Sequence, residues 1–144
     1  MNNLENSAKK ENQKKEISSP NNKNLTEATD AKIDLSYLKE IADGNDAFII
    51  EMIELFLQKT PEALEEMNAS FQKQNWEELR LIAHRIKPSY SYVGLPEIQI
   101  MLSEIESCSD SKTNLEKIPV MISQVKKTSN NAFKDLEKEL DGLK

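Results

Sequence analysis

The chain has 144 residues and a net charge of −6, with few aromatic residues and only three glycines. This acidic balance argues against a DNA- or RNA-binding protein, whose affinity comes largely from Lys and Arg on phosphates. No apolar run approaches the roughly 18 residues that a membrane span requires, and the N-terminus lacks the apolar region of a secretory signal. We therefore expect a cytoplasmic protein, and the single cysteine, Cys108, cannot form an internal disulfide.

Residues 1–32 are predicted to form a disordered N-terminal tail. They are rich in Asn, Lys, Glu and Ser, and their few apolar residues follow no regular period. Such a segment cannot bury enough apolar surface to offset the entropy of ordering it. Its six lysines and five acidic residues give a net charge of +1, which leaves −7 for the predicted folded domain, residues 33–144.

Two helices are predicted at the start of the domain. A short one covers residues 34–42 and stops at Gly44, and a longer one begins near residues 45–46. Apolar or small side chains recur every three or four positions along the longer helix, so they share one face. That face consists of Ile49, Met52, Ile53, Phe56, Thr60, Ala63, Leu64, Met67 and Phe71. Pro61 falls inside this helix and should kink or divide it.

A third helix is predicted to start at Asn75, which can cap it together with Glu78 in a capping box. The apolar spacing predicts that this helix continues past Gly94 and ends in a loop at residues 107–111. Its apolar face consists of Trp76, Leu79, Ala83, Ile86, Tyr90 and Val93, with Ile82 alongside, and then Ile98, Leu102 and Ile105.

The last helical region covers residues 115–143, where Pro119 either occupies a first turn or separates two helices. Its stripe consists of Leu115, Ile118, Ile122, Val125, Ser129, Ala132, Phe133, Leu136, Leu140 and Leu143. The sequence has neither an alternating strand pattern nor an internal repeat. Amphipathic helices joined by short loops predict an all-α fold, an antiparallel four-helix bundle with a short additional N-terminal helix.

The only histidine, His84, is the main candidate for chemistry. Zinc sites usually need three or four Cys, His or acidic ligands, so one His and one Cys predict no metal site. Cys108 lies 24 residues along the predicted helix, about 36 Å from His84 if the helix is straight, which argues against a Cys–His nucleophilic pair. The chain also lacks a Gly-rich phosphate-binding loop, so we expect neither kinase nor hydrolase activity.

On a helical wheel, His84 points roughly 140–150° away from the centre of the core face, toward water or a partner. Lys87 follows it by three residues and Arg80 precedes it by four, so both cations can reach over the ring. A neutral imidazole nitrogen is a good nucleophile, and cations would stabilise the oxygens of a phosphoryl group placed on it. By itself, however, an exposed histidine between two cations is most often an ordinary surface residue.

The local string decides between these interpretations. Residues 81–89 read LIAHRIKPS and are followed by Gly94, a pattern that resembles the signature of histidine phosphotransfer (Hpt) domains. The resemblance covers about residues 33–140. The resemblance implies that the chain is an all-helical bundle that takes part in a phosphorelay and carries the phosphoryl group on His84.

The resemblance also implies roles for the neighbours of His84. Lys87 matches the lysine that supports the phosphoryl group, Ser89 the small polar residue after it, and Gly94 a glycine that lets helices approach closely. Pro88 stands where the family usually has glycine. Because proline removes a backbone donor and restricts the residue before it, we expect Lys87 to leave helical angles and the helix to bend between residues 84 and 88.

The function implied is that of a monomeric carrier that accepts a phosphoryl group from a receiver-domain aspartate and transfers it to another receiver. Its partners would be response regulators and hybrid histidine kinases. It would need no cofactor, because the magnesium ion belongs to the receiver, and would have no autonomous kinase activity. The alternative is a non-catalytic helical adaptor that binds receivers or other proteins, suggested by Pro88 and by Leu81, Tyr92 and Leu95 near the site.

Overall fold

The computed structural model describes residues 31–144, so the predicted tail lies outside the described residues except for its last two positions. The described part is helical throughout, without strands. Its elements are α3 (Ser36–Ala42), α4 (Asp46–Gln72), α5 (Trp76–Ile86), α6 (Ser89–Tyr92), α7 (Pro96–Ser111), the 3₁₀ helix η1 (Leu115–Lys117) and α8 (Ile118–Leu143). None of these helices is long and apolar enough to cross a membrane.

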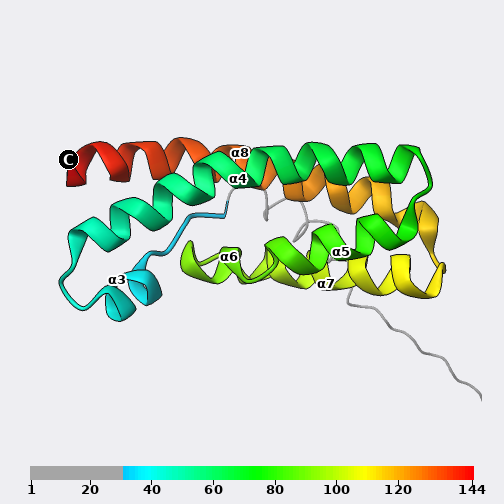
Figure 1. Ribbon diagram of the computed structural model, residues 1–144, viewed down its shortest axis with the longest axis horizontal. Coiled ribbons are helices and arrows are strands. Elements are labelled where there is room, and N and C mark those ends of the chain that lie inside the picture. The colour runs from blue at the N-terminus through cyan, green and yellow to red at the C-terminus, as the bar shows by residue number, and fades with distance from the viewer. Residues whose placement is uncertain (1–30) are drawn as a thin grey trace, which may run out of the picture.

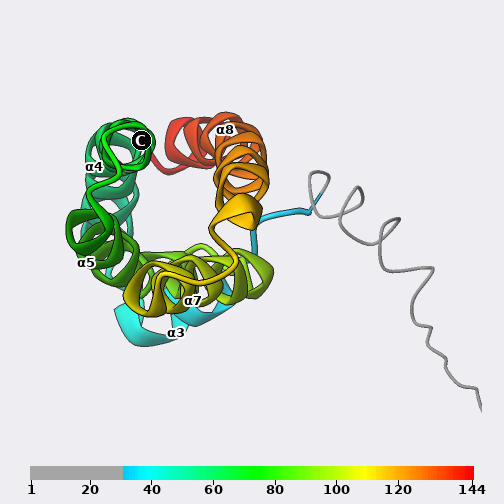
Figure 2. The ribbon, with the colours of Figure 1, turned by 90° about the vertical axis from the view of Figure 1, so that its right-hand side faces the viewer.

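The helices α4, α5, α7 and α8 form an antiparallel bundle in which each contacts its two neighbours in that order (Figures 1 and 2). The short helix α3 packs across one end, against α4 and α6. The predicted fold, a four-helix bundle with a short additional N-terminal helix, is therefore confirmed. The buried side chains form one apolar core between the four helices.

Asparagine side chains cap the two helices that were predicted to start at them. The Asn45 side-chain oxygen accepts a hydrogen bond from the Phe48 backbone N–H at 3.1 Å. At α5, Asn75 accepts from the Glu78 backbone N–H at 3.2 Å and donates its amide to the Glu78 carboxylate at 3.2 Å. The bonds from Phe48 N–H and Glu78 N–H satisfy backbone donors that the first turn of a helix leaves free.

The helices α4 and α8 accommodate Pro61 and Pro119 without being divided. Pro61 lies within the continuous helix α4, whose axis bends near its middle in Figure 1. The predicted kink is present and the predicted division is not. Pro119 occupies the first turn of α8, where its missing N–H has no intrahelical partner to lose, and η1 precedes it.

The predicted continuation of the third helix past Gly94 is wrong. The chain reverses at residues 93–95 and returns as α7, antiparallel to α5 (Figure 1). Gly94 has a φ of +71°, which favours glycine, and Pro96 is in the first turn of α7. These turn signals outweigh the apolar period. α7 extends through Ser111, so the loop predicted at residues 107–111 is also wrong.

The short helix α6 is anchored in the core by an aromatic residue. The Tyr90 side chain is fully buried, its hydroxyl hydrogen-bonds Ser129 of α8 at 2.7 Å, and Phe56 of α4 packs edge-on against its ring. Burial raises the pKa of Tyr90 well above its ordinary value. Since α6 follows directly on the end of α5, this anchor fixes the segment that bears the candidate site.

Candidate functional site

His84 lies in the last turn of α5 with its ring directed away from the core. Its side chain is 66% exposed, while its neighbours Ala83 and Ile86 are buried. The outward direction predicted from the helical wheel is therefore confirmed. The amphipathic spacing of α5 is sufficient to produce it, because the buried residues determine which face remains in solvent.

A single carboxylate from α7 contacts two of the candidate residues, His84 in the last turn of α5 and Lys87 directly after it. Glu106 Oε2 lies 2.9 Å from His84 Nδ1, and Glu106 Oε1 lies 2.8 Å from Lys87 Nζ. Glu106 was not predicted from the sequence, because the third helix was expected to continue without a turn from residue 75 to residue 106. The Gly94-Leu95-Pro96 turn signal could have revealed the reversal that brings α7 back alongside His84.

The charge state of Glu106 determines which histidine nitrogen is free. The hydrogen bond from Lys87 and, to a smaller degree, contact with His84 hold the pKa of Glu106 below its ordinary value, against an opposing effect of burial. A carboxylate only accepts hydrogen bonds, so the contact with His84 requires a proton on Nδ1. In the neutral ring, Nε2 then carries the lone pair, and the exposed side chain leaves it accessible.

The helix is interrupted at Lys87 and Pro88, within the region where Pro88 predicts a bend. α5 ends at Ile86, two residues after His84, and α6 begins at Ser89. The predicted displacement of Lys87 from helical angles is wrong, since its φ of −55° and ψ of −47° are helical. Proline disfavours but does not forbid such angles in the preceding residue. The Lys87 ammonium therefore stays on the side of α5 that faces Glu106.

The second predicted cation, Arg80, binds carboxylates rather than covering the ring. Its guanidinium donates to both oxygens of Glu77, at 2.8 and 3.2 Å, and lies 3.8 Å from Asp110. The hydrogen bonds to Glu77 raise the pKa of Arg80. Arg80 lines a shallow pocket beside His84 together with Lys87, Ser103, Glu106, Ser107 and Asp110.

The supporting residues lie on the α6 side of the site. Ser89 starts α6 and is half-buried, and Gly94 forms the turn after α6, where the Asp34 backbone N–H bonds the Val93 carbonyl at 2.9 Å. A Cβ on Gly94 would lie 2.8 Å from the Asp34 nitrogen and closer still to its oxygen. The close approach implied for Gly94 therefore exists, but to the segment before α3 rather than between two long helices.

Cys108 lies much nearer to His84 along the fold than a straight helix would place it. α7 runs back along α5 and brings Glu106, two residues before Cys108, into contact with His84. The expected separation of about 36 Å, from a rise of 1.5 Å per residue, is therefore wrong. Cys108 is nevertheless buried, and burial raises the pKa of its thiol. It is therefore held in the protonated form, which is a poor nucleophile.

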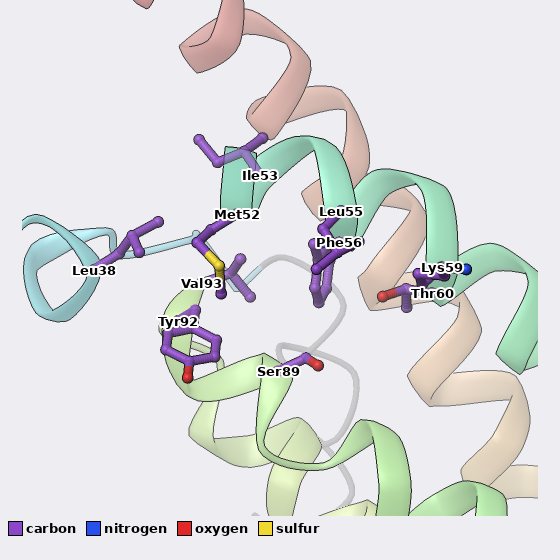
Figure 3. Close-up of a pocket in the computed structure, with 10 residues that line it drawn as sticks. All are labelled: Leu38, Met52, Ile53, Leu55, Phe56, Lys59, Thr60, Ser89, Tyr92 and Val93. Atoms are coloured by element: carbon purple, nitrogen blue, oxygen red, sulfur yellow. The ribbon is translucent and has the colours of Figure 1, made fainter. Parts of the chain in front are cut away.

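An apolar groove opens beside α6, between α3 and α4. Figure 3 shows the side chains of Leu38, Met52, Phe56, Tyr92 and Val93 around this hollow. A more polar groove adjoins it, shares Lys59, Thr60 and Ser89, and extends to Glu66 and Arg85, which form an ion pair at 3.1 Å. Since Arg85 follows His84 directly, one surface runs from α3 to the edge of the candidate site.

No group of three or more His, Cys, Asp or Glu residues able to hold a metal ion occurs in the described part of the chain. The site therefore consists of an accessible imidazole nitrogen, a carboxylate that holds the opposite nitrogen, and an adjacent ammonium. This arrangement suits a nucleophile that receives an anionic group.

Comparison with known proteins points to one family. The model of the Hpt domain family matches residues 51–143, which include His84, Lys87 and Glu106. The chain is 28% identical over 106 residues to the phosphorelay intermediate protein rdeA of Dictyostelium discoideum. The aligned region covers 73% of this chain and 41% of that protein, so the chain spans less than half of its relative. No solved structure matches the chain. Since the family match covers well over half of the sequence and nearly all of the bundle, the chain belongs to the Hpt domain family.

Proposed function

We propose that this chain is a phosphorelay carrier. His84 accepts a phosphoryl group from the phosphoaspartate of one receiver domain and transfers it to the aspartate of another. One observation carries the proposal: in a member of the Hpt family, the only histidine is exposed and has its Nδ1 engaged by Glu106, which directs the free Nε2 outward. The protein itself needs no kinase activity, because the phosphoryl group arrives already activated.

The chemistry requires no external proton donor or acceptor. Nε2 of His84 attacks the phosphorus, a P–N bond forms, and the P–O bond to the receiver aspartate breaks. The aspartate leaves as a carboxylate, while the ring keeps its Nδ1 proton and becomes positively charged. The Glu106 carboxylate at 2.9 Å stabilises that charge. The reverse sequence of bond changes delivers the phosphoryl group to the next receiver.

Lys87 is the residue placed to stabilise the phosphoryl oxygens. Its ammonium has three donors, so it can hold Glu106 at 2.8 Å and still donate to a phosphoryl oxygen on the adjacent ring. Arg80 is tied to Glu77 and Asp110. We propose that it contributes positive charge at longer range, with a smaller effect than Lys87. Ser89, Pro88 and Gly94 support the site by holding α6.

The partners we propose are receiver domains of response regulators and hybrid histidine kinases. A receiver has to bring its aspartate to His84 and cover adjacent surface at the same time. The groove beside α6, which Leu55 lines, and the side chain of Leu81, three residues before His84 on α5, provide apolar surface; both leucines are about half exposed. We further propose that the domain, residues 33–144, acts as a cytoplasmic monomer and binds no nucleic acid.

The test is direct transfer from a panel of phosphorylated receivers encoded in the same genome. We expect the wild-type chain to acquire acid-labile, alkali-stable phosphate from at least one receiver, and His84→Gln to acquire none. If no receiver labels the wild-type chain, the carrier function is wrong. If receivers also bind wild type and His84→Gln equally tightly, the non-catalytic adaptor, which the apolar groove would serve, becomes the better description.

A further inference from the structure

The backbone of Lys87 is held from the opposite helix. The side chain of Gln99, in the second turn of α7, donates to the Lys87 carbonyl at 3.0 Å in a partly buried contact. A carbonyl oxygen only accepts, so the glutamine amide has to present its NH₂ group there. The same carbonyl also accepts the Tyr90 backbone N–H at 3.2 Å.

This contact lies at the interruption that Pro88 introduces between α5 and α6. Proline provides no backbone N–H, so the regular ladder of helix hydrogen bonds cannot continue through it. Lys87 nevertheless keeps helical angles. The carbonyl that loses its helical donor is that of His84, whereas the Lys87 carbonyl keeps a local donor in Tyr90 and has Gln99 as a second, tertiary one. The Gln99 amide therefore restrains, from α7, the residue whose ammonium serves the site.

The two contacts to Lys87 come from one face of α7. Gln99 and Glu106 are seven residues apart, two turns of helix, and Ser103 of the shallow pocket lies between them on that face. Gln99 binds the backbone carbonyl of Lys87, and Glu106 binds its ammonium at 2.8 Å. One rigid helix therefore holds both ends of the same residue.

We propose that Gln99 is a positioning residue for phosphoryl transfer: it fixes the Lys87 backbone from α7. This role rests on the proposed function, because it acts through Lys87. Gln99 itself does not contact the reacting atoms. It sets where the Lys87 ammonium lies relative to Glu106 and to the phosphoryl group on His84.

The first test removes the donor and keeps the length of the side chain. Gln99→Met should slow phosphoryl transfer at saturating receiver by roughly three- to tenfold, the factor that corresponds to the net contribution of one hydrogen bond. The receiver concentration at half-saturation should change by less than about twofold. The matched control is Gln72→Met, at the exposed end of α4, which should leave both quantities unchanged. A Gln99→Met rate equal to wild type would overturn the proposal.

The second test asks whether Gln99 acts through Lys87. In a Lys87→Ala background the ammonium is absent, so Gln99→Met should slow transfer further by less than about twofold. The same slowing in both backgrounds would show that Gln99 does not act through Lys87. Gln99→Ala, measured in parallel, should behave like Gln99→Met, and thermal melting of each variant separates a positioning effect from a loss of fold.

A third measurement does not depend on phosphoryl transfer. NMR titration of the unphosphorylated protein reports the carboxyl pKa of Glu106, which the Lys87 ammonium lowers and which His84 and Arg80 also face. Gln99→Met should raise this pKa toward its ordinary value, while Gln72→Met should not. An unchanged pKa would overturn the positioning role even if transfer were absent. If the pKa rises but the wild-type chain takes no phosphate, the carrier function fails and the structural part of the inference stands.

Discussion

The Glu106 carboxylate binds both His84 and Lys87, and these two contacts have different consequences for phosphoryl transfer in the proposed carrier. In the proposed carrier it would stabilise the positive charge that the His84 ring acquires on phosphorylation, because it accepts a hydrogen bond from the Nδ1–H group. It also binds the Lys87 ammonium, for which the phosphoryl oxygens compete. Under the proposed function, the balance between these two contacts would govern how readily the phosphoryl group arrives and leaves.

His84→Gln should abolish phosphoryl acceptance without damaging the fold. The side chain is 66% exposed, and substitutions at such positions usually change the free energy of unfolding by less than about 0.5 kcal/mol. Radiolabelling from a phosphorylated receiver measures acceptance, and thermal unfolding measures stability. A large fall in melting temperature would mean that the contact with Glu106 is a major structural interaction.

Lys87→Ala should slow transfer more than it weakens receiver binding. In its proposed role the ammonium meets charge that gathers on the phosphoryl group during the reaction, and removing such a donor typically reduces the rate about a hundredfold or more. Single-turnover rates measured across receiver concentrations separate the two effects. If the rate at saturating receiver is unchanged, Lys87 does not stabilise the phosphoryl group and only binds Glu106.

Glu106→Gln should lose stability in a pH-dependent way. The folded-state pKa of Glu106 lies below its ordinary value of 4.5, so its ionised form stabilises the fold above that value. This contribution is lost as the pH falls through the lowered folded pKa. The difference in unfolding free energy between wild type and Glu106→Gln should therefore be largest at neutral pH and shrink on the acid side. Urea denaturation across this range measures it, and a pH-independent difference would contradict the assignment.

At the level of elements, the turn between α6 and α7 connects the site to the N-terminal segment. Asp34 bonds the Val93 carbonyl, the Tyr37 and Tyr92 rings stack at 6.0 Å, and Tyr90 anchors α6 to α8. α6 is one turn long and could not persist as an isolated helix. Contacts from α3, α4, α7 and α8 therefore maintain the segment that follows Lys87.

Gly94→Ala should destabilise the domain by roughly 1–3 kcal/mol, because it adds both a strained positive φ and a clash with the Asp34 backbone. Gly44→Ala is the matched comparison, since Gly44 has a φ of +86° but open space around its Cβ position. It should show the strain without the clash and a smaller loss. Chemical denaturation of both variants provides the measurement, and equal losses would mean that the approach of Asp34 is readily relaxed.

On the scale of the whole molecule, the boundary between tail and domain can be tested by truncation. Ala31 and Ile33 pack partly against the core, and Leu35 is buried. Deleting residues 1–30 should leave melting temperature and transfer rate nearly unchanged, whereas deleting residues 1–35 should lower the melting temperature by several degrees. The larger deletion removes the Leu35 side chain and the Asp34 hydrogen bond. A large effect of the shorter deletion would place part of the tail on the bundle.

Local sequence signals predicted the elements and the accessible histidine. The three- and four-residue spacing placed His84 on the face away from the core, and a cap predicted at Asn75 marked the start of α5. The same spacing failed at Gly94, because apolar residues recur with one period whether a helix continues or folds back on itself. Periodicity describes which face is apolar, and turn residues decide whether the chain reverses.

The sequence by itself determined that the chain is an all-helical member of its family, with one exposed histidine and a lysine three residues after it. Only the tertiary structure decided what these two residues contact. Glu106 lies 22 residues from His84, and Gln99 lies 12 residues from Lys87. Such pairs depend on the register in which α7 packs against α5, and that register is set by the turn at Gly94 and by the core, not by any local pattern. The contacts between helices are therefore the part of the site that could be identified only from the tertiary structure.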